Sequence, residues 1–413
     1  MNLLPLSDRS LNFIALAAAN KNNANSCDLA ILEGHYDIDV LTECVNKIAS
    51  THPIMQSRVV KKGFRYYWQF DAQLYPEKRF LDWSEQYSNV EQWHAALRQF
   101  VIDNPIDPFN GSGVAFVYVK FRSYSALMFL SSHAVSDARS GYILFEQLHA
   151  LLTDQPIPNQ DNSFCEDHLL FDSVTYQAMF KAAARLACEL FKAKKTIPIK
   201  ASGQWQIDYH DLGVEATESV LAWARKYQFS ANVVLNYVFN KVLNNGKKYT
   251  MIETMSVRAL SSRNLSSSYN NLILSFGSDI GGDSNWMQAY QSRLNRLKSG
   301  DHTVHQAEQR LQSLSINLMP RRGLKLLVDS YKRLFLNGNV ILSNLGKLEF
   351  DLKSIGKCKI IDIYNFSVPL PPAGLAIVVS TYQGRLRISY AHEGGDITSI
   401  KRAVECEIAS LNE

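Results

Sequence analysis

The sequence holds 413 residues, of which 46% are hydrophobic and 20% are charged. This composition excludes a disordered, collagen-like or coiled-coil chain, and the length fits two to three domains or one fold with two packed halves. The charge balance is 43 − 39 = +4, and no long basic run accompanies it, which argues against nucleic acid as a partner.

The cysteines and the N-terminus indicate the compartment. The six cysteines show no C-x-x-C pair and no metal-ligand spacing, so we expect reduced core residues of a cytoplasmic protein. No basic region precedes the first apolar stretch, which Asp8 and Arg9 interrupt, so no secretory signal is predicted. No apolar run approaches the roughly 18 residues that a membrane span requires.

Helical and strand-like periods alternate along the first half, which predicts an α/β or α+β fold. Leu41, Cys44, Val45 and Ile48 recur at helical spacing. The runs GVAFVYVKF and SALMFLSS, with a polar turn between them, predict a hairpin. The predicted strands cover residues 27–36, 65–70, 113–121 and 125–132, and the predicted helices cover 39–50, 90–102, 136–153 and 171–194.

The second half repeats this alternation after a polar stretch, residues 196–204, which we interpret as a linker. Two similar-sized lobes are therefore predicted, at residues 1–195 and 196–413. The predicted strands cover 248–257, 339–343, 359–366, 374–382 and 385–391, and the predicted helices cover 215–227, 230–243, three stretches within 286–335 and one from 397. A small basic cluster near the linker is read as solvated, with docking of an acidic partner as the alternative; it consists of Lys192, Lys194, Lys195 and Lys200.

The segment Ser132-His133-Ala134-Val135-Ser136-Asp137 is the candidate for chemistry, because a predicted apolar strand ends there and a helix follows. This junction is expected to place His133 at the edge of a cleft. A neutral imidazole can accept a proton from a hydroxyl or an amine that attacks an acyl carbon, so His133 is a candidate general base. Asp137 either caps the helix or pairs with an arginine; the alternative for both residues is a purely structural role.

In this segment, SHAVSDARS, the sequence resembles the superfamily of chloramphenicol acetyltransferase, peptide-synthetase condensation domains and stand-alone acyltransferases, whose motif is H-H-x-x-x-D-G. His133 matches the catalytic His and Asp137 the Asp. Ser132 replaces the first His, and Ala138 replaces the Gly. Further resemblances follow in the family's order over nearly the whole chain: THPIMQSRV, NPIDPFNGSGVAFVYV, LAWARKYQFSANVVLNYVFNKVL, SVRALSSRN, SNLGKLEF and GLAIVVSTYQGRLRISY. The last two look most like alcohol O-acyltransferases and polyketide-diol acyltransferases.

The resemblance implies two chloramphenicol-acetyltransferase-like lobes, each a mixed sheet with flanking helices, in a V-shaped pseudo-dimer with a tunnel between them. It implies an acyltransferase that moves an acyl group from a thioester to a hydroxyl acceptor in secondary-metabolite or lipid biosynthesis, with His133 as the base. The donor would be acyl-CoA or an acyl carrier protein, no further cofactor is implied, and a monomer is expected. A condensation enzyme that forms an amide, and a catalytically silent binding module, are the alternatives.

The resemblance also indicates the residues around His133. Arg258, at the V-x-x-R position, is the first choice as partner of Asp137, and Arg58 is the second, because Gln56 stands where the family has Arg. An ion-paired Asp137 would orient the loop rather than relay protons. Ser343, Asn344, Gly346 and Ser132 are candidates for binding the oxyanion or lining the tunnel; the alternative is that Asn344 and Gly346 only form a turn.

Other catalytic patterns are missing from the sequence. The G-x-S-x-G elbow, the Walker loop and the dinucleotide glycine pattern do not occur, which argues against hydrolase, NTPase and dehydrogenase functions. His302 and His305 lie three residues apart, but no third ligand accompanies them, so no metal site is predicted.

Overall fold

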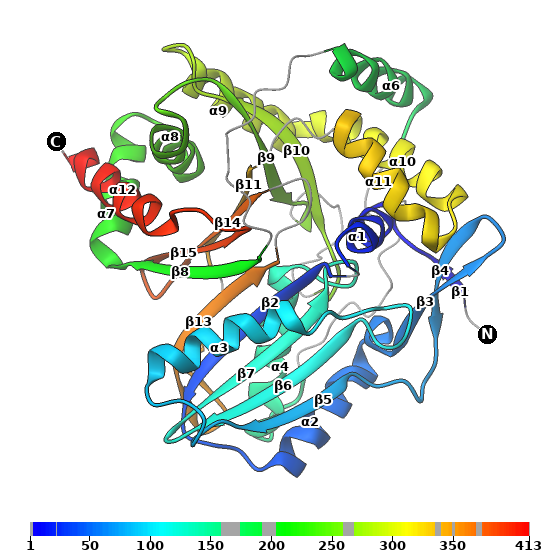
Figure 1. Cartoon of the computed structure of the whole chain (residues 1–413), viewed down its shortest axis with the longest axis vertical. Helices are drawn as coiled ribbons and strands as arrows, with labels where there is room; N and C mark the ends of the chain where they lie inside the picture. The colour runs from blue at the N-terminus through cyan, green and yellow to red at the C-terminus, as the bar shows by residue number, and fades with distance from the viewer. Residues whose placement is uncertain are drawn as a thin grey trace.

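The computed structural model describes residues 3–21, 23–157, 174–191, 204–258, 268–334, 340–348, 352–368 and 374–412. The described residues form two large mixed sheets and one small sheet, with helices packed on the large ones (Figure 1). The predicted α/β fold with two lobes is confirmed. The predicted lobe boundary and the basic cluster around it lie outside the described residues.

The first large sheet has the strand order β12-β13-β2-β7-β6-β5, in which only β5 and β6 are parallel. Its central strand β2 is buried along its length except at Glu33, because both faces of the sheet are covered. The strands are β2 (Asn25–Glu33), β5 (Glu77–Asp82), β6 (Val114–Phe121), β7 (Tyr124–Ser132), β12 (Ser354–Ile355) and β13 (Cys358–Ser367).

The hairpin predicted for β6 and β7 is confirmed. Phe121 pairs with Tyr124, which leaves a turn of two residues, and Arg122 takes the left-handed backbone conformation (φ 53°) that such a turn requires. Both strands are almost entirely buried, as their continuous apolar runs indicate.

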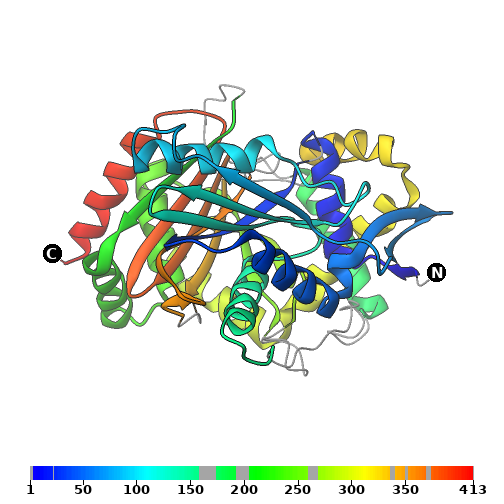
Figure 2. The same cartoon turned by 90° about the horizontal axis from the view of Figure 1, so that it is seen from below.

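Three helices cover the two faces of the first sheet. Figure 2 shows α3 (Val90–Asp103) on one side and α2 (Ile38–Thr51) with α4 (Ala138–Leu152) on the other. Because side chains of a strand alternate between faces, Leu29 and Ile31 of β2 pack in the α3 core, while Ala30 and Leu32 pack in the core of α2 and α4.

The second large sheet has the order β10-β9-β11-β14-β15-β8, with β11 parallel to both neighbours. A hairpin joins β14 to β15 through Gln383 and Gly384, both at positive φ. The strands are β8 (Gln206–Leu212), β9 (Tyr249–Ser256), β10 (Ile273–Ile280), β11 (Val340–Lys347), β14 (Leu375–Tyr382) and β15 (Arg385–His392).

Two groups of helices accompany this sheet (Figure 1). Three helices pack on one another and on the sheet: α7 (Gly213–Lys226), α8 (Ala231–Asn244) and α12 (Ile397–Ala409). The other group lies near its β10 edge and consists of α1 (Asp8–Ala19), α6 (Tyr176–Phe191), α9 (Trp286–Arg296), α10 (His302–Leu318) and α11 (Arg321–Leu334). A π-helical turn, Leu297–Asp301, connects α9 to α10.

The second half of the chain contributes two strands to the first sheet. β12 and β13 come from the second half of the sequence but belong to the first sheet, where Asn365 pairs with Asp28 of β2. Ile207, Ala376 and Ala391 of the second sheet pack in the same core cluster as α3. The two lobes are therefore connected by shared strands and by a common core cluster.

Several described elements have no counterpart among the predicted ones. They are α1, β1 (Leu3–Pro5), β3 (Ser57–Lys62), β5, β8, β10 and β12. β1 and β3 flank the predicted aromatic strand, now β4 (Arg65–Phe70), in the small antiparallel sheet. Among the described helices, none is long and apolar enough to cross a membrane.

Candidate active site

His133 lies immediately after the last residue of β7, in a short turn that leads into α4. Its backbone N–H donates to the carbonyl of Ala24 (2.7 Å), and its own carbonyl accepts from the side chain of Asn271. The residue is therefore held by backbone contacts from both halves of the chain. Its side chain is half-buried.

One ring nitrogen of His133 has a fixed role. Nδ1 lies 2.9 Å from the carbonyl oxygen of Ser136. A carbonyl oxygen can only accept, so Nδ1 carries the proton and the lone pair of the neutral ring is on Nε2. That arrangement leaves Nε2 able to take a proton from a substrate.

The surroundings of His133 keep its ring neutral. Burial lowers the pKa of His133 below its ordinary value of 6.5, and this outweighs the opposite effect of the Asp137 charge and the Ser136 carbonyl. The ring stacks on Phe13 of α1, with centroids 4.3 Å apart and an interplanar angle of 21°. At neutral pH the residue is therefore a base rather than a cation.

Asp137 is the N-cap of α4, where its side chain accepts from the backbone N–H of Ser140. It also forms an ion pair with Arg258, whose Nη2 lies 2.6 Å from Oδ1, and its Oδ2 accepts from the N–H of Leu272 (2.9 Å). Among the described residues, it shares no hydrogen bond with His133. The geometry suits a group that holds the loop and the helix start together.

Arg258 connects the two halves of the chain. It follows β9, and besides Asp137 it donates to the carbonyls of Ser268 (2.8 Å) and Asn270 (3.1 Å). The carbonyl of Asn270 also accepts from the hydroxyl of Ser140 in α4 (2.9 Å). The side chains of these residues are buried, so solvent screens the interactions at this junction only weakly.

The second candidate partner of Asp137 lies elsewhere. Arg58 is exposed on β3, where its Nε donates to the side chain of Gln69 (3.2 Å). Gln56 is buried and donates to the carbonyl of Ala72 (3.0 Å). Of the two predicted arginines, Arg258 is the one that contacts Asp137.

Of the candidates for oxyanion binding, Ser343, Asn344 and Gly346 are not brought to His133 by any contact within the described residues. The hydroxyl of Ser343 accepts from Thr254 (2.9 Å), and Asn344 donates to Asn232 (3.1 Å), both within the second half. Gly346 has φ 68° and donates its N–H to the side chain of Asn344, which is a turn geometry. Ser132 is buried at the end of β7, next to His133.

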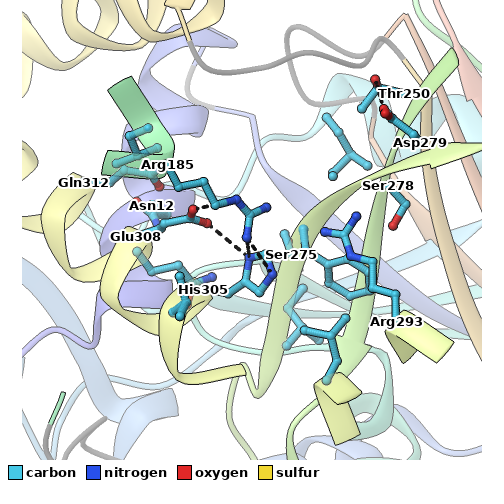
Figure 3. Close-up of a pocket in the computed structure, with 18 of the residues that line it drawn as sticks. Asn12, Arg185, Thr250, Ser275, Ser278, Asp279, Arg293, His305, Glu308 and Gln312 are labelled. Atoms are coloured by element: carbon cyan, nitrogen blue, oxygen red, sulfur yellow. Dashed lines mark hydrogen bonds and ion pairs between the residues drawn. The ribbon is translucent and has the colours of Figure 1, made fainter. Parts of the chain in front are cut away.

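A cavity of about 1200 Å³ lies between the β9–β10 edge of the second sheet and α1, α6, α9 and α10. Figure 3 shows side chains from these elements, among them Asn12, Arg185 and Arg293, that surround the cavity. Its described lining includes Phe13 but not His133. The cavity thus reaches the ring that stacks on the candidate base, and the tunnel predicted to run past His133 stays a prediction.

Three residues of the site were missed by the sequence interpretation. Phe13 stacks on His133, Asn271 holds its carbonyl, and Ser140 contacts Asp137, Arg258 and Asn270. Ser140 stands three residues after Asp137, which is the position whose N–H an N-cap side chain usually accepts from. Its contact with Asp137 could therefore be predicted from the sequence. Phe13 and Asn271 carry no local signal.

Potential metal ligands and cysteines are the groups that could form a reactive grouping outside the His133 site. Among the described residues, no group of three or more His, Cys, Asp or Glu side chains could hold a metal ion. Five described cysteines are free, and Cys188 and Cys406 are exposed, so the expectation that all are core residues is wrong for these two. Cys188 lies on the solvent-facing side of the amphipathic helix α6, and Cys406 lies on that of α12.

Comparison with known proteins gives a fold but no close sequence relative. No protein-family model and no curated protein matches the chain. Among solved structures, the epimerization domain from the third module of tyrocidine synthetase B is similar with a TM-score of 0.72 and 14% identity, over 99% of this chain and 97% of that one.

Two condensation domains are similar to nearly the same extent. The first condensation domain of the calcium-dependent antibiotic synthetase, in complex with a substrate analogue, has a TM-score of 0.70 and 13% identity, over 100% of this chain and 96% of its own. The starter condensation domain of rhizomide synthetase, in complex with C8-CoA, has a TM-score of 0.69 and 13% identity, over 100% and 95%. The chain therefore has the two-lobed fold of these epimerization and condensation domains.

Proposed function

We propose that the chain is an acyltransferase that moves an acyl group from a thioester to a hydroxyl acceptor, with His133 as the general base. The observation that carries the proposal is the neutral ring of His133, whose Nδ1–H is held by the Ser136 carbonyl so that the lone pair is on Nε2. The donor would be acyl-CoA or an acyl group on the phosphopantetheine of a carrier protein.

The reaction can be written with this residue alone as proton carrier. Nε2 takes the proton of the acceptor hydroxyl while its oxygen forms a bond to the thioester carbonyl carbon, which gives a tetrahedral oxyanion. The oxyanion collapses, the C–S bond breaks, and the thiolate leaves with the proton from Nε2. Asp137 and Arg258 orient the loop, and Ser343, Asn344 and Ser132 remain candidates for contacting the oxyanion or the substrates.

A second candidate function has an amine as the acceptor, since the fold is shared with condensation domains. The same base would then assist amide formation. A catalytically silent binding module is the outcome that a lack of any transfer would favour.

The test is mass spectrometry of acyl transfer from acyl-CoA and from an acyl carrier protein to a mixture of alcohols and amines. His133→Ala is expected to lose at least about a hundredfold in rate, because general base catalysis contributes that much. The matched control is His35→Ala, which removes an imidazole near the opposite end of β7, at the carbonyl of Arg122. Equal rates in His133→Ala and wild type would refute the assignment of His133.

A further inference from the structure

The cavity next to Phe13 has two chemically different walls. One wall is apolar and consists of side chains from α1 and the second sheet, among them Phe13, Leu16, Ile252 and Phe276. The other carries the guanidinium groups of Arg185 from α6 and Arg293 from α9, which Figure 3 shows extending toward the same space. A ligand that fits both walls has an apolar body and a charged group.

The two arginines differ in how their charge is compensated. Arg185 lies 3.1 Å from the carboxylate of Glu308, which also contacts the buried ring of His305. Arg293 is half-buried, and within the part of the chain that the structure describes it forms neither a hydrogen bond nor an ion pair; its guanidinium packs over the ring of Phe276 at 5.6 Å. Burial and the neighbouring charge of Arg185 lower the pKa of Arg293, and this outweighs the opposite effect of the Glu253 and Asp279 charges.

The carboxyl groups nearby are engaged by other partners. Asp279 is bound by Lys248 (2.9 Å) and by the hydroxyl of Thr250 (2.8 Å). Glu253 attracts Arg293 electrostatically, but it is hydrogen-bonded by Tyr290 and Asn232, and burial raises its pKa. The cavity lining carries more positive than negative side chains, namely Arg9, Arg185, Lys248, Arg293 and Arg296 against Asp279, Asp283 and Glu308. An anionic ligand would balance this excess of positive charge.

We infer that this cavity binds a small amphipathic acceptor whose carboxylate or phosphate group is held by Arg293 and Arg185, with its apolar body along the wall that ends at Phe13. The role of acceptor rests on the proposed function, because Phe13 stacks on His133. The binding itself does not depend on catalysis.

The test is isothermal titration calorimetry of the full chain with decanoate, decyl phosphate and decan-1-ol. Decanoate or decyl phosphate is expected to bind, and Arg293→Gln should weaken that binding at least tenfold, because a charge-assisted hydrogen bond is lost. The preferred anion identifies the headgroup as carboxylate or phosphate. The matched control is Arg402→Gln, which removes the same charge from an exposed position on α12 and should leave affinity unchanged.

Three results would overturn the inference: binding of decan-1-ol as tight as that of the anions, unchanged anion binding in Arg293→Gln, or a lower melting temperature of this variant without ligand. A guanidinium without a hydrogen-bond or ion-pair partner among the described residues should be dispensable for stability. Arg293-dependent binding of coenzyme A without binding of the decyl anions would also overturn it, since the cavity would then hold phosphates of the donor.

The experiment separates this inference from the proposed function. His133→Ala should bind the anions as the wild type does. Anion binding together with full transfer activity in His133→Ala would refute the catalytic proposal alone. Transfer that requires His133 but uses neutral acceptors, with no anion binding, would refute the cavity assignment alone.

Discussion

Replacing Arg258 by methionine tests whether the buried ion pair with Asp137 fastens the two halves of the chain together. The side chains of Arg258 and Asp137 are only 8% and 5% exposed, so solvent screens their interaction weakly. Methionine leaves the Asp137 carboxylate with its hydrogen bonds from Ser140 and Leu272 but without a counter-charge. Breaking a buried pair in this way costs about 3–5 kcal/mol of unfolding free energy.

The assay is urea unfolding followed by circular dichroism. The matched control is Arg385→Met, which breaks the pair with Asp211 in which Arg385 is 45% exposed, and which should cost about 1 kcal/mol or less. The double variant Arg258→Met/Asp137→Asn should be more stable than Arg258→Met, because it removes the orphaned charge. A loss for Arg258→Met no larger than that of the control would refute this reasoning.

The remaining predictions concern buried groups of the first half. Burial lowers the pKa of His52 to about 4, whereas an unfolded His titrates near 6.5, so the unfolded state binds the proton first as the pH falls. The free energy of unfolding is therefore lost as the pH falls from 6.5 to 4, by about 3 kcal/mol for this residue. Urea titrations of His52→Gln should show a shallower dependence of unfolding free energy on pH than those of the wild type. The same slope in both proteins would contradict the prediction. Gly141→Ala would drive a Cβ into the buried carboxyl of Asp28, which Asn365 holds, so it should cost about 1–3 kcal/mol in thermal unfolding. Gly111→Ala, where a Cβ meets open space, is the control, and equal melting of both variants would contradict the clash.

The local position of His133 could be predicted from sequence because each neighbouring element has a strong local signal. β7 is a continuous apolar run, and Asp137 has the side-chain chemistry of an N-cap. Those two signals mark where the turn that contains His133 begins and ends. In the structure the strand ends at Ser132 and the helix starts at Ala138.

The described elements that the sequence does not predict have weaker local patterns of hydrophobicity, or patterns that fit more than one kind of segment. In β10 the buried residues Leu274, Phe276, Ser278 and Ile280 alternate with less buried ones, but Gly277 and the polar Ser278 lower its strand propensity. α1 does have a readable start, because Ser7 caps it and Leu11, Ile14 and Ala15 lie on one face.

Contacts between distant parts of the chain set the limit of the sequence reasoning. Arg258 and Asp137 are 121 residues apart, and only the family resemblance connected them. Asn271 and Phe13 reach His133 from the second half and from α1, and neither has a pattern that marks such a contact. The exchange of β13 into the first sheet likewise depends on the pairing of remote strands, which periodicity does not specify.

The central claim is that His133 presents an unprotonated Nε2. The most direct measurement is the ¹⁵N chemical shift of both ring nitrogens at pH 7 in the labelled protein, with the His133 signals assigned by their loss in His133→Gln. The account predicts a neutral ring with the proton on Nδ1, since that atom donates to the Ser136 carbonyl. A doubly protonated ring, or a neutral ring with the proton on Nε2, would contradict it.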